Sequence, residues 1–129
     1  MADEVTVNVS LSYSDNQNTE ASLSVADALF SVATKKVTRL KQNVAITEEA
    51  IQLGDVTAPA YAMFVNRDTT NFINLKVGTS GAIFAKLRPD VDGDGKGGVA
   101  LLELGSGAQV PYAIADTGTC QMDVFIISL

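Results

Sequence analysis

The sequence carries one stretch whose residue types and spacing suggest a site, a run of acids and glycines at residues 90–98. Carboxylates at the first, third and fifth positions of a loop, with glycine at the sixth, are typical of calcium-binding loops. Asp90, Asp92 and Asp94 are therefore candidate calcium ligands, and Gly95 fills the sixth position. The twelfth position is Leu101, where such a loop needs a bidentate glutamate. The pattern therefore favours an exposed, flexible acidic hairpin tip over a calcium site.

Composition restricts any other chemistry. The 129-residue chain contains no histidine and a single cysteine, Cys120. Without imidazole, Ser-His-Asp and Cys-His arrangements and Cys/His zinc sites are excluded. Acidic residues are plentiful, but no spacing singles out a carboxylate pair for glycoside hydrolysis. We therefore predict that the protein is not an enzyme and has no cofactor, unless the acidic loop binds calcium.

The charge balance excludes some classes of partner. Nine basic and fifteen acidic residues give a net charge of −6. Nucleic acids and anionic membranes select clustered Lys and Arg, so neither is expected as a partner. The nearest basic cluster, at residues 35–41, is explained by a solvated strand face. No apolar run approaches the length of a membrane span, and residues 1–4 lack the features of a secretion signal.

Short strands are the elements that must position these residues. The second half of the chain holds apolar runs with a period of two, which is the signature of a strand. In the last run, Cys120 shares a face with Met122 and Val124, which predicts a buried thiol. The spacing of the runs predicts an all-β, antiparallel β-sandwich. The runs are residues 61–65 (apolar face Tyr61/Met63/Val65), 72–77, 83–87, 99–104 and 120–129.

The first half is less regular. Val5, Val7, Val9 and Leu11 alternate with polar residues over 5–13, which predicts a strand, followed by a loop at 14–20. Residues 21–34 fit either a strand or a helical face, and flanking strands favour the strand. Residues 35–53 predict one or two strands around a turn near 41–43, and 47–50 fit a single helical turn. No linker separates the halves, so we predict one β-sandwich domain over 1–129, with 1–20 as an N-terminal strand or arm and loop.

The segments at residues 53–59, 61–68, 72–78, 85–89, 110–116 and 120–129 follow a characteristic order and spacing. In this order and spacing the chain resembles small structural proteins of tailed bacteriophages. The resemblance covers residues 35–129 and depends on the order and spacing of segments. It does not extend to residues 1–34, and the acidic insertion after Pro89 departs from the short turn of the family.

The resemblance implies a jelly-roll-like sandwich of about eight strands and a virion structural protein. Within that class, size and acidity favour a head decoration (cement) protein, made in the host cytoplasm and located on the capsid surface. The implied partners are the major capsid protein and sister subunits in a homo-oligomer, often a trimer. Two alternatives remain: a tail, neck or fibre component, and a carbohydrate-binding jelly roll.

An interface is expected on the N-terminal strand. Val5, Val7, Val9 and Leu11 are the candidate residues for contacts with the shell or a sister subunit. The competing interpretation, which we favour from the sequence alone, is that this strand completes its own sandwich.

Overall fold

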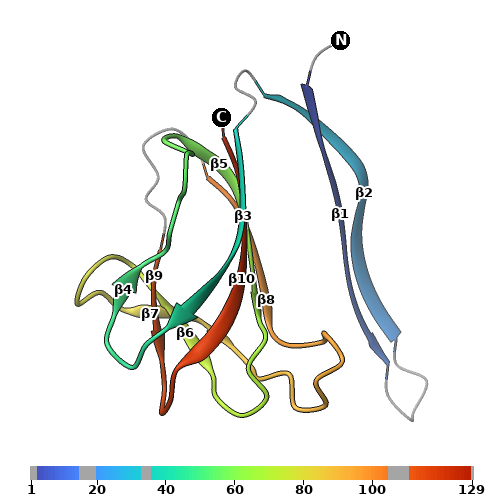
Figure 1. Ribbon diagram of the computed structural model, residues 1–129. Coiled ribbons are helices and arrows are strands. Elements are labelled where there is room, and N and C mark those ends of the chain that lie inside the picture. Colours follow the sequence, from blue (N-terminus) through green and yellow to red (C-terminus); the bar gives the residue numbers. More distant parts are fainter. Residues whose placement is uncertain (1–2, 15–19, 33–35, 105–110, 129) are drawn as a thin grey trace. The chain divides into compact units, whose positions relative to one another are not determined.

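The computed structural model describes residues 3–14, 20–32, 36–104 and 111–128, and every regular element in these ranges is a β-strand (Figure 1). The predicted all-β fold is therefore confirmed. The described part of the chain contains no helix that could cross a membrane. The chain divides into two compact units, Met1–Lys35 and Lys36–Leu129, and each is described by itself. A single domain over residues 1–129 stays a prediction.

The first unit is an antiparallel hairpin of β1 (Asp3–Ser14) and β2 (Glu20–Val32). Its register pairs Val9 with Val25, and Val7 with Ala28, so β2 has two residues opposite the single Asn8. This is a β-bulge, and Asp27 within it has a φ of 55° and donates its N–H to Asn8 Oδ1 at 2.9 Å.

The bulge explains why the sequence of β2 was ambiguous. An extra residue shifts the alternation of β2 by one, so Val25 and Ala28 both face the side that holds Val7 and Val9. Val25 and Ala28 are three residues apart, which is also the spacing of residues on one face of a helix. The predicted strand over 21–34 is confirmed for its described part, whereas most of the predicted loop at 14–20 lies outside the described residues.

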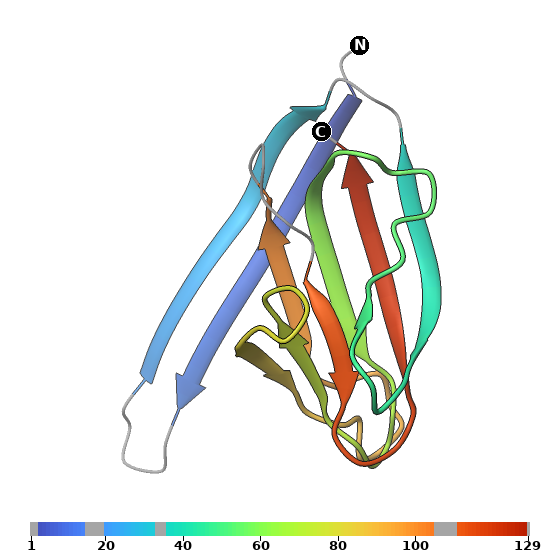
Figure 2. The same ribbon diagram turned by 90° about the vertical axis from the view of Figure 1, so that its left-hand side faces the viewer.

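The second unit holds eight strands in two four-stranded antiparallel sheets, with β5, β10 and β3 side by side in Figure 2. Numbered from β3, the strand orders are 1-8-3-6 and 2-7-4-5, which is the order of a jelly roll. The predicted eight-stranded, jelly-roll-like sandwich is therefore confirmed for this unit. Sheet B comprises β3 (Val37–Val44), β10 (Cys120–Ser128), β5 (Pro59–Asn66) and β8 (Val99–Glu103), in that order. Sheet C comprises β4 (Glu49–Ala50), β9 (Tyr112–Ala115), β6 (Ile73–Lys76) and β7 (Ile83–Leu87).

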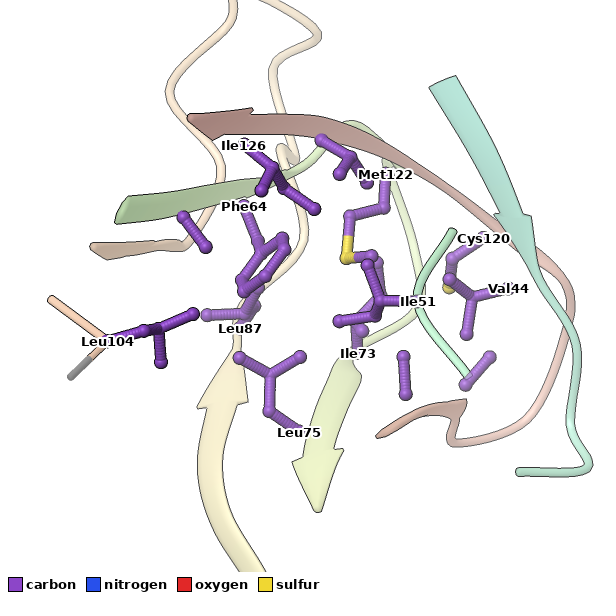
Figure 3. Packing of buried hydrophobic residues seen from close by; sticks show 14 of the residues in the cluster. Val44, Ile51, Phe64, Ile73, Leu75, Leu87, Leu104, Cys120, Met122 and Ile126 are labelled. Carbon is purple, nitrogen blue, oxygen red and sulfur yellow. The ribbon is translucent and has the colours of Figure 1, made fainter. Parts of the chain in front are cut away.

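The hydrophobic core lies between these two sheets. Every second residue of β10 from Cys120 to Ile126 is at most 1% exposed, which confirms the predicted burial of the thiol. Figure 3 shows Phe64 of β5 reaching toward Leu87 of β7, and Met122 of β10 reaching toward Ile51. Inward apolar residues from both sheets thus fill the space between them, as the period of two requires.

Strand β5 buries the face opposite to the one that stood out in the sequence. Tyr61, Met63 and Val65 point outward, whereas Phe64 and Asn66 are both 0% exposed. Asn66 is accommodated by hydrogen bonds: Nδ2 donates to Asn71 O at 2.9 Å and Leu87 O at 3.0 Å, and Oδ1 accepts from Asp68 N at 2.9 Å. A polar residue on the inner face concealed which side of the strand is buried.

Two local predictions are wrong. No turn interrupts residues 41–43, because β3 continues through them and Gln42 points inward. Its Nε2 donates to Ala50 O at 3.0 Å and its Oε1 accepts from Gln52 N at 2.9 Å, so this polar residue joins two segments of the sandwich. Residues 47–50 form no helical turn: they end in β4, where Glu49 Oε1 accepts the Ala45 N–H at 2.8 Å.

Candidate binding surfaces

The acidic loop at residues 88–98 joins β7 to β8 and is organised by Asp90, which is 4% exposed. Its Oδ2 accepts the Gly95 N–H at 2.8 Å, and its Oδ1 accepts the N–H groups of Asp94 and Lys96, both at 3.3 Å. Burial disfavours the charged form, but these donors outweigh it, so the pKa of Asp90 is lowered. The carboxylate therefore stays ionised and serves as an acceptor within its own loop.

Of the other two candidate calcium ligands, Asp94 belongs to the same hydrogen-bond network, because its Oδ1 also accepts the Lys96 N–H, at 3.2 Å. Asp92 and Asp94 are exposed, and Asp94 Oδ2 forms an ion pair with Lys96 Nζ at 3.3 Å. Among the described residues, no three His, Cys, Asp or Glu side chains are placed together to hold a metal ion. A calcium ion here would compete with backbone N–H groups for Asp90, so calcium binding by Asp90, Asp92 and Asp94 stays a prediction.

Hydrogen bonds attach the loop to the body at several points. Asp90 N donates to Asp68 O at 2.7 Å, and Arg67 Nη1 donates to Gly95 O at 3.2 Å. At the start of the loop, Arg88 Nη2 donates to Lys96 O at 2.7 Å. The predicted hairpin tip is therefore wrong: β7 and β8 lie in different sheets, and the segment is a hydrogen-bonded connection between the two sheets with Asp90 buried in it.

The β1–β2 hairpin carries the second candidate surface, its apolar face. Of the four predicted interface residues, Val5 is 8% exposed and Val7 is half-buried, whereas Val9 and Leu11 are 43% and 75% exposed. Sequence reasoning missed the contribution of β2, because the bulge concealed its alternation. We define the hairpin apolar face by its exposed members of both strands, Val9, Leu11, Tyr13, Leu23 and Val25.

The pairing within this face is direct. Leu11 lies opposite Leu23, and each side chain is 75% exposed. The opposite face of the hairpin is mostly serine and threonine, with Leu29 paired to Thr6 as its large apolar residue. The hairpin thus has one strongly apolar side and one polar side, which is the pattern of a sheet that packs on another surface.

The outer face of sheet B is a third candidate, which the sequence did not reveal. The residues of three neighbouring rows run across β3, β10, β5 and β8 in register. The signal was present as alternation in residues 61–65 and 99–103, but deciding which side faces outward required the tertiary structure. The rows are Val37–Ile127–Tyr61–Glu103, Arg39–Phe125–Met63–Leu101 and Lys41–Asp123–Val65–Val99.

A shallow hollow of about 410 Å³ lies on this outer face, lined in part by Arg39, Lys41, Met63 and Phe125. At its edge, Arg67 Nε forms an ion pair with Asp123 Oδ2 at 2.7 Å. Across the sheet, Tyr61 Oη donates to Glu103 Oε1 at 3.4 Å. Burial and then the charge of Glu103 raise the pKa of Tyr61, so the phenol stays protonated and donates.

Cys120 and the Lys76–Glu48 ion pair have structural roles in the second unit. Burial, followed by the charges of Asp68 and Asp116, raises the pKa of the Cys120 thiol to about 11. A neutral buried thiol is a poor nucleophile. Lys76 Nζ forms an ion pair with Glu48 Oε2 at 2.5 Å, and Glu48 also accepts the Ser80 N–H, which fixes the turn after β6.

Comparison with known proteins gives no match to a family model, to a curated protein or to a solved structure.

Proposed function

We propose that this protein is a bacteriophage virion structural protein, a decoration (cement) protein that binds the outside of the assembled head. It contacts the major capsid protein as a homo-oligomer, braces neighbouring capsomers and acts by binding without catalysis. Support comes from the resemblance of residues 35–129 to small structural proteins of tailed bacteriophages. The jelly-roll body is compatible with that class, and the choice of the head depends on the resemblance.

The observation that carries the proposal is the exposed hairpin apolar face. A two-stranded hairpin is marginally stable by itself in water. This hairpin has strands of 12 and 13 residues, yet its paired residues Leu11 and Leu23 remain 75% exposed. Contiguous exposed apolar surface of this kind marks a site of interaction with another macromolecule. The face therefore needs a partner, and the proposed partner is the capsid surface.

Mass action explains how such binding stabilises a shell. A protein that binds only the assembled shell adds its binding free energy to the stability of that shell. The same contact repeats at every symmetry-related site, so a modest interface gives a large total. An oligomer that engages several sites at once gains further apparent affinity.

The test combines the purified full-length chain with isolated heads that lack it, and with isolated tails. Co-sedimentation with heads and a higher temperature of head rupture are expected. Binding to tails alone, or to neither particle, would overturn the head assignment. A glycan array run in parallel tests the carbohydrate alternative, and specific glycan binding without head binding would replace the proposal.

A further inference from the structure

Sheet B has an outer face whose two edges carry opposite charges. Arg39 and Lys41 lie on the edge strand β3, and Glu103 lies on the opposite edge strand β8. Phe125 and Met63 lie between them on β10 and β5, 37% and 39% exposed. The centre also holds Asp123, whose charge is paired with Arg67. A face with a basic edge, a largely apolar centre and an acidic edge is complementary to its own copy after a rotation that exchanges the edges.

We propose that the outer face of sheet B is a two-fold contact between two copies of this chain, with the axis parallel to the strands and midway between β10 and β5. This rotation places β3 of one copy opposite β8 of the other, and β10 opposite β5. Each cross-strand row then faces the same row of the second copy. Phe125 packs on Met63 of the second copy, and this contact occurs twice.

The charged edges meet in the same arrangement. Glu103 of the second copy lies opposite Val37, two residues along the strand from Arg39. Packed sheets are about 10 Å apart and two residues span about 7 Å, distances that Arg and Glu side chains bridge together. The symmetry generates this ion pair twice, once at each edge of the contact.

Charge excludes the other two-fold arrangement of two stacked copies of this face. An axis in the plane of the contact but perpendicular to the strands places β3 opposite β3. Arg39 would then approach Arg39 of the second copy, and like charges opposite each other are destabilising. The distribution of charge therefore selects the axis parallel to the strands.

The same rotation places side chains of the second copy over the hollow on this face. It lies beside Arg39 and Lys41 and has a volume of about 410 Å³. Leu101 and Val99 of the second copy, which are 41% and 55% exposed, come to lie over these two residues. Apolar side chains of one copy thus enter a hollow of the other.

The size of the face predicts a weak dimer. Four strands and five residues along each give a flat area of about 300 Å² per copy from strand spacing and rise. Stable complexes bury about 800 Å² of accessible surface per partner. We therefore expect association that depends on concentration, in the micromolar range or weaker. This inference goes beyond the proposed function, because it requires no virion.

The experiment is analytical ultracentrifugation of the full-length chain from micromolar to millimolar concentration at physiological salt. Wild type is expected to show a reversible monomer–dimer equilibrium. Arg39→Glu and Glu103→Arg each replace two attractive pairs with repulsive ones and should weaken the dimer about tenfold or more. The double variant Arg39→Glu/Glu103→Arg restores opposite charges and should regain most of the lost affinity.

The controls separate this contact from others. Lys41→Glu, a reversal on the same strand opposite Val99, should have a smaller effect than Arg39→Glu. All substituted positions are exposed, so circular dichroism should show unchanged folding. The proposal would be overturned if the chain were monomeric at every concentration or formed a trimer. It would also be overturned if neither charge reversal weakened the dimer, or if the double variant did not restore it.

Discussion

Asn66 offers the most decisive test of how the sandwich is held together. Its side chain is 0% exposed at the end of β5, and its three hydrogen bonds reach Asp68, Asn71 and Leu87. Asn66→Ala removes all three and leaves two carbonyl groups and one N–H without this partner. At about 1 kcal/mol for each hydrogen bond, the free energy of unfolding should fall by about 3 kcal/mol.

The matched control is Asn43→Ala on β3, because Asn43 is exposed. It should change stability by less than about 0.5 kcal/mol. Urea unfolding at pH 7, followed by far-UV circular dichroism, measures both. A loss below about 1 kcal/mol for Asn66→Ala, or equal losses for the two variants, would refute the role of Asn66.

Asn66→Asp tests the same hydrogen bonds through the pH dependence of stability. A carboxylate accepts the Asp68 N–H but cannot donate to the two carbonyl groups, and burial disfavours its charge. The pKa of the introduced carboxyl group should therefore be raised in the folded state. The stability contributed by the protonated carboxyl group is fully present below its unfolded pKa of about 3.9 and is lost as pH rises through the folded pKa. The stability difference from wild type should shrink in acid, and a difference independent of pH would contradict the reasoning.

Three further predictions concern the loop and the core. Asp90→Asn should lower stability at neutral pH and make stability depend less on pH in acid. The lowered pKa of Asp90 gives stability that is present above the unfolded pKa and is lost as pH falls through the folded pKa. Urea unfolding that shows the same loss of stability in acid for wild type and variant would contradict this. Cys120, with a pKa raised to about 11, should resist a thiol reagent at pH 8 until the chain is unfolded in denaturant, and rapid labelling of the native protein would contradict its burial. Gly98→Ala places a Cβ 2.5 Å from the backbone atom Arg88 N and should lower the thermal midpoint strongly. Gly93→Ala leaves the nearest atom 3.9 Å away and should cost only the strain of its φ of 66°, about 1 kcal/mol, so a smaller loss for Gly98→Ala than for Gly93→Ala would contradict the close approach.

Strands were predictable from the sequence wherever one face is uniformly apolar. Cys120, Met122 and Val124 identified β10 and the burial of the thiol, because their alternation is unbroken. The prediction failed where inward positions are polar or small. The polar residue Gln42 was read as part of a turn, although it points inward within β3. Strand β9 was missed because its buried residues, Ala113 and Ala115, give little hydrophobic signal.

The candidate surfaces required information that is not local in the sequence. Val9 and Leu11 were identifiable from β1, but Leu23 and Val25 join them only through the pairing of β1 with β2. The outer face of sheet B brings together strands that are distant in the sequence: Val37 of β3 pairs with Ile127 of β10, 90 residues later. Spacing in the sequence therefore predicts strands far better than it predicts which strands share a surface.

The central claim is that the hairpin apolar face binds the assembled head. The most direct measurement compares head binding by the full-length wild-type chain, by Leu11→Ser/Leu23→Ser on that face, and by Leu29→Ser on the opposite face. Burying each exposed leucine is worth about 1–2 kcal/mol, so the double variant should bind roughly 30-fold more weakly or worse. Leu29→Ser should bind like wild type. Equal binding by all three proteins, with folding intact by circular dichroism, would contradict the account.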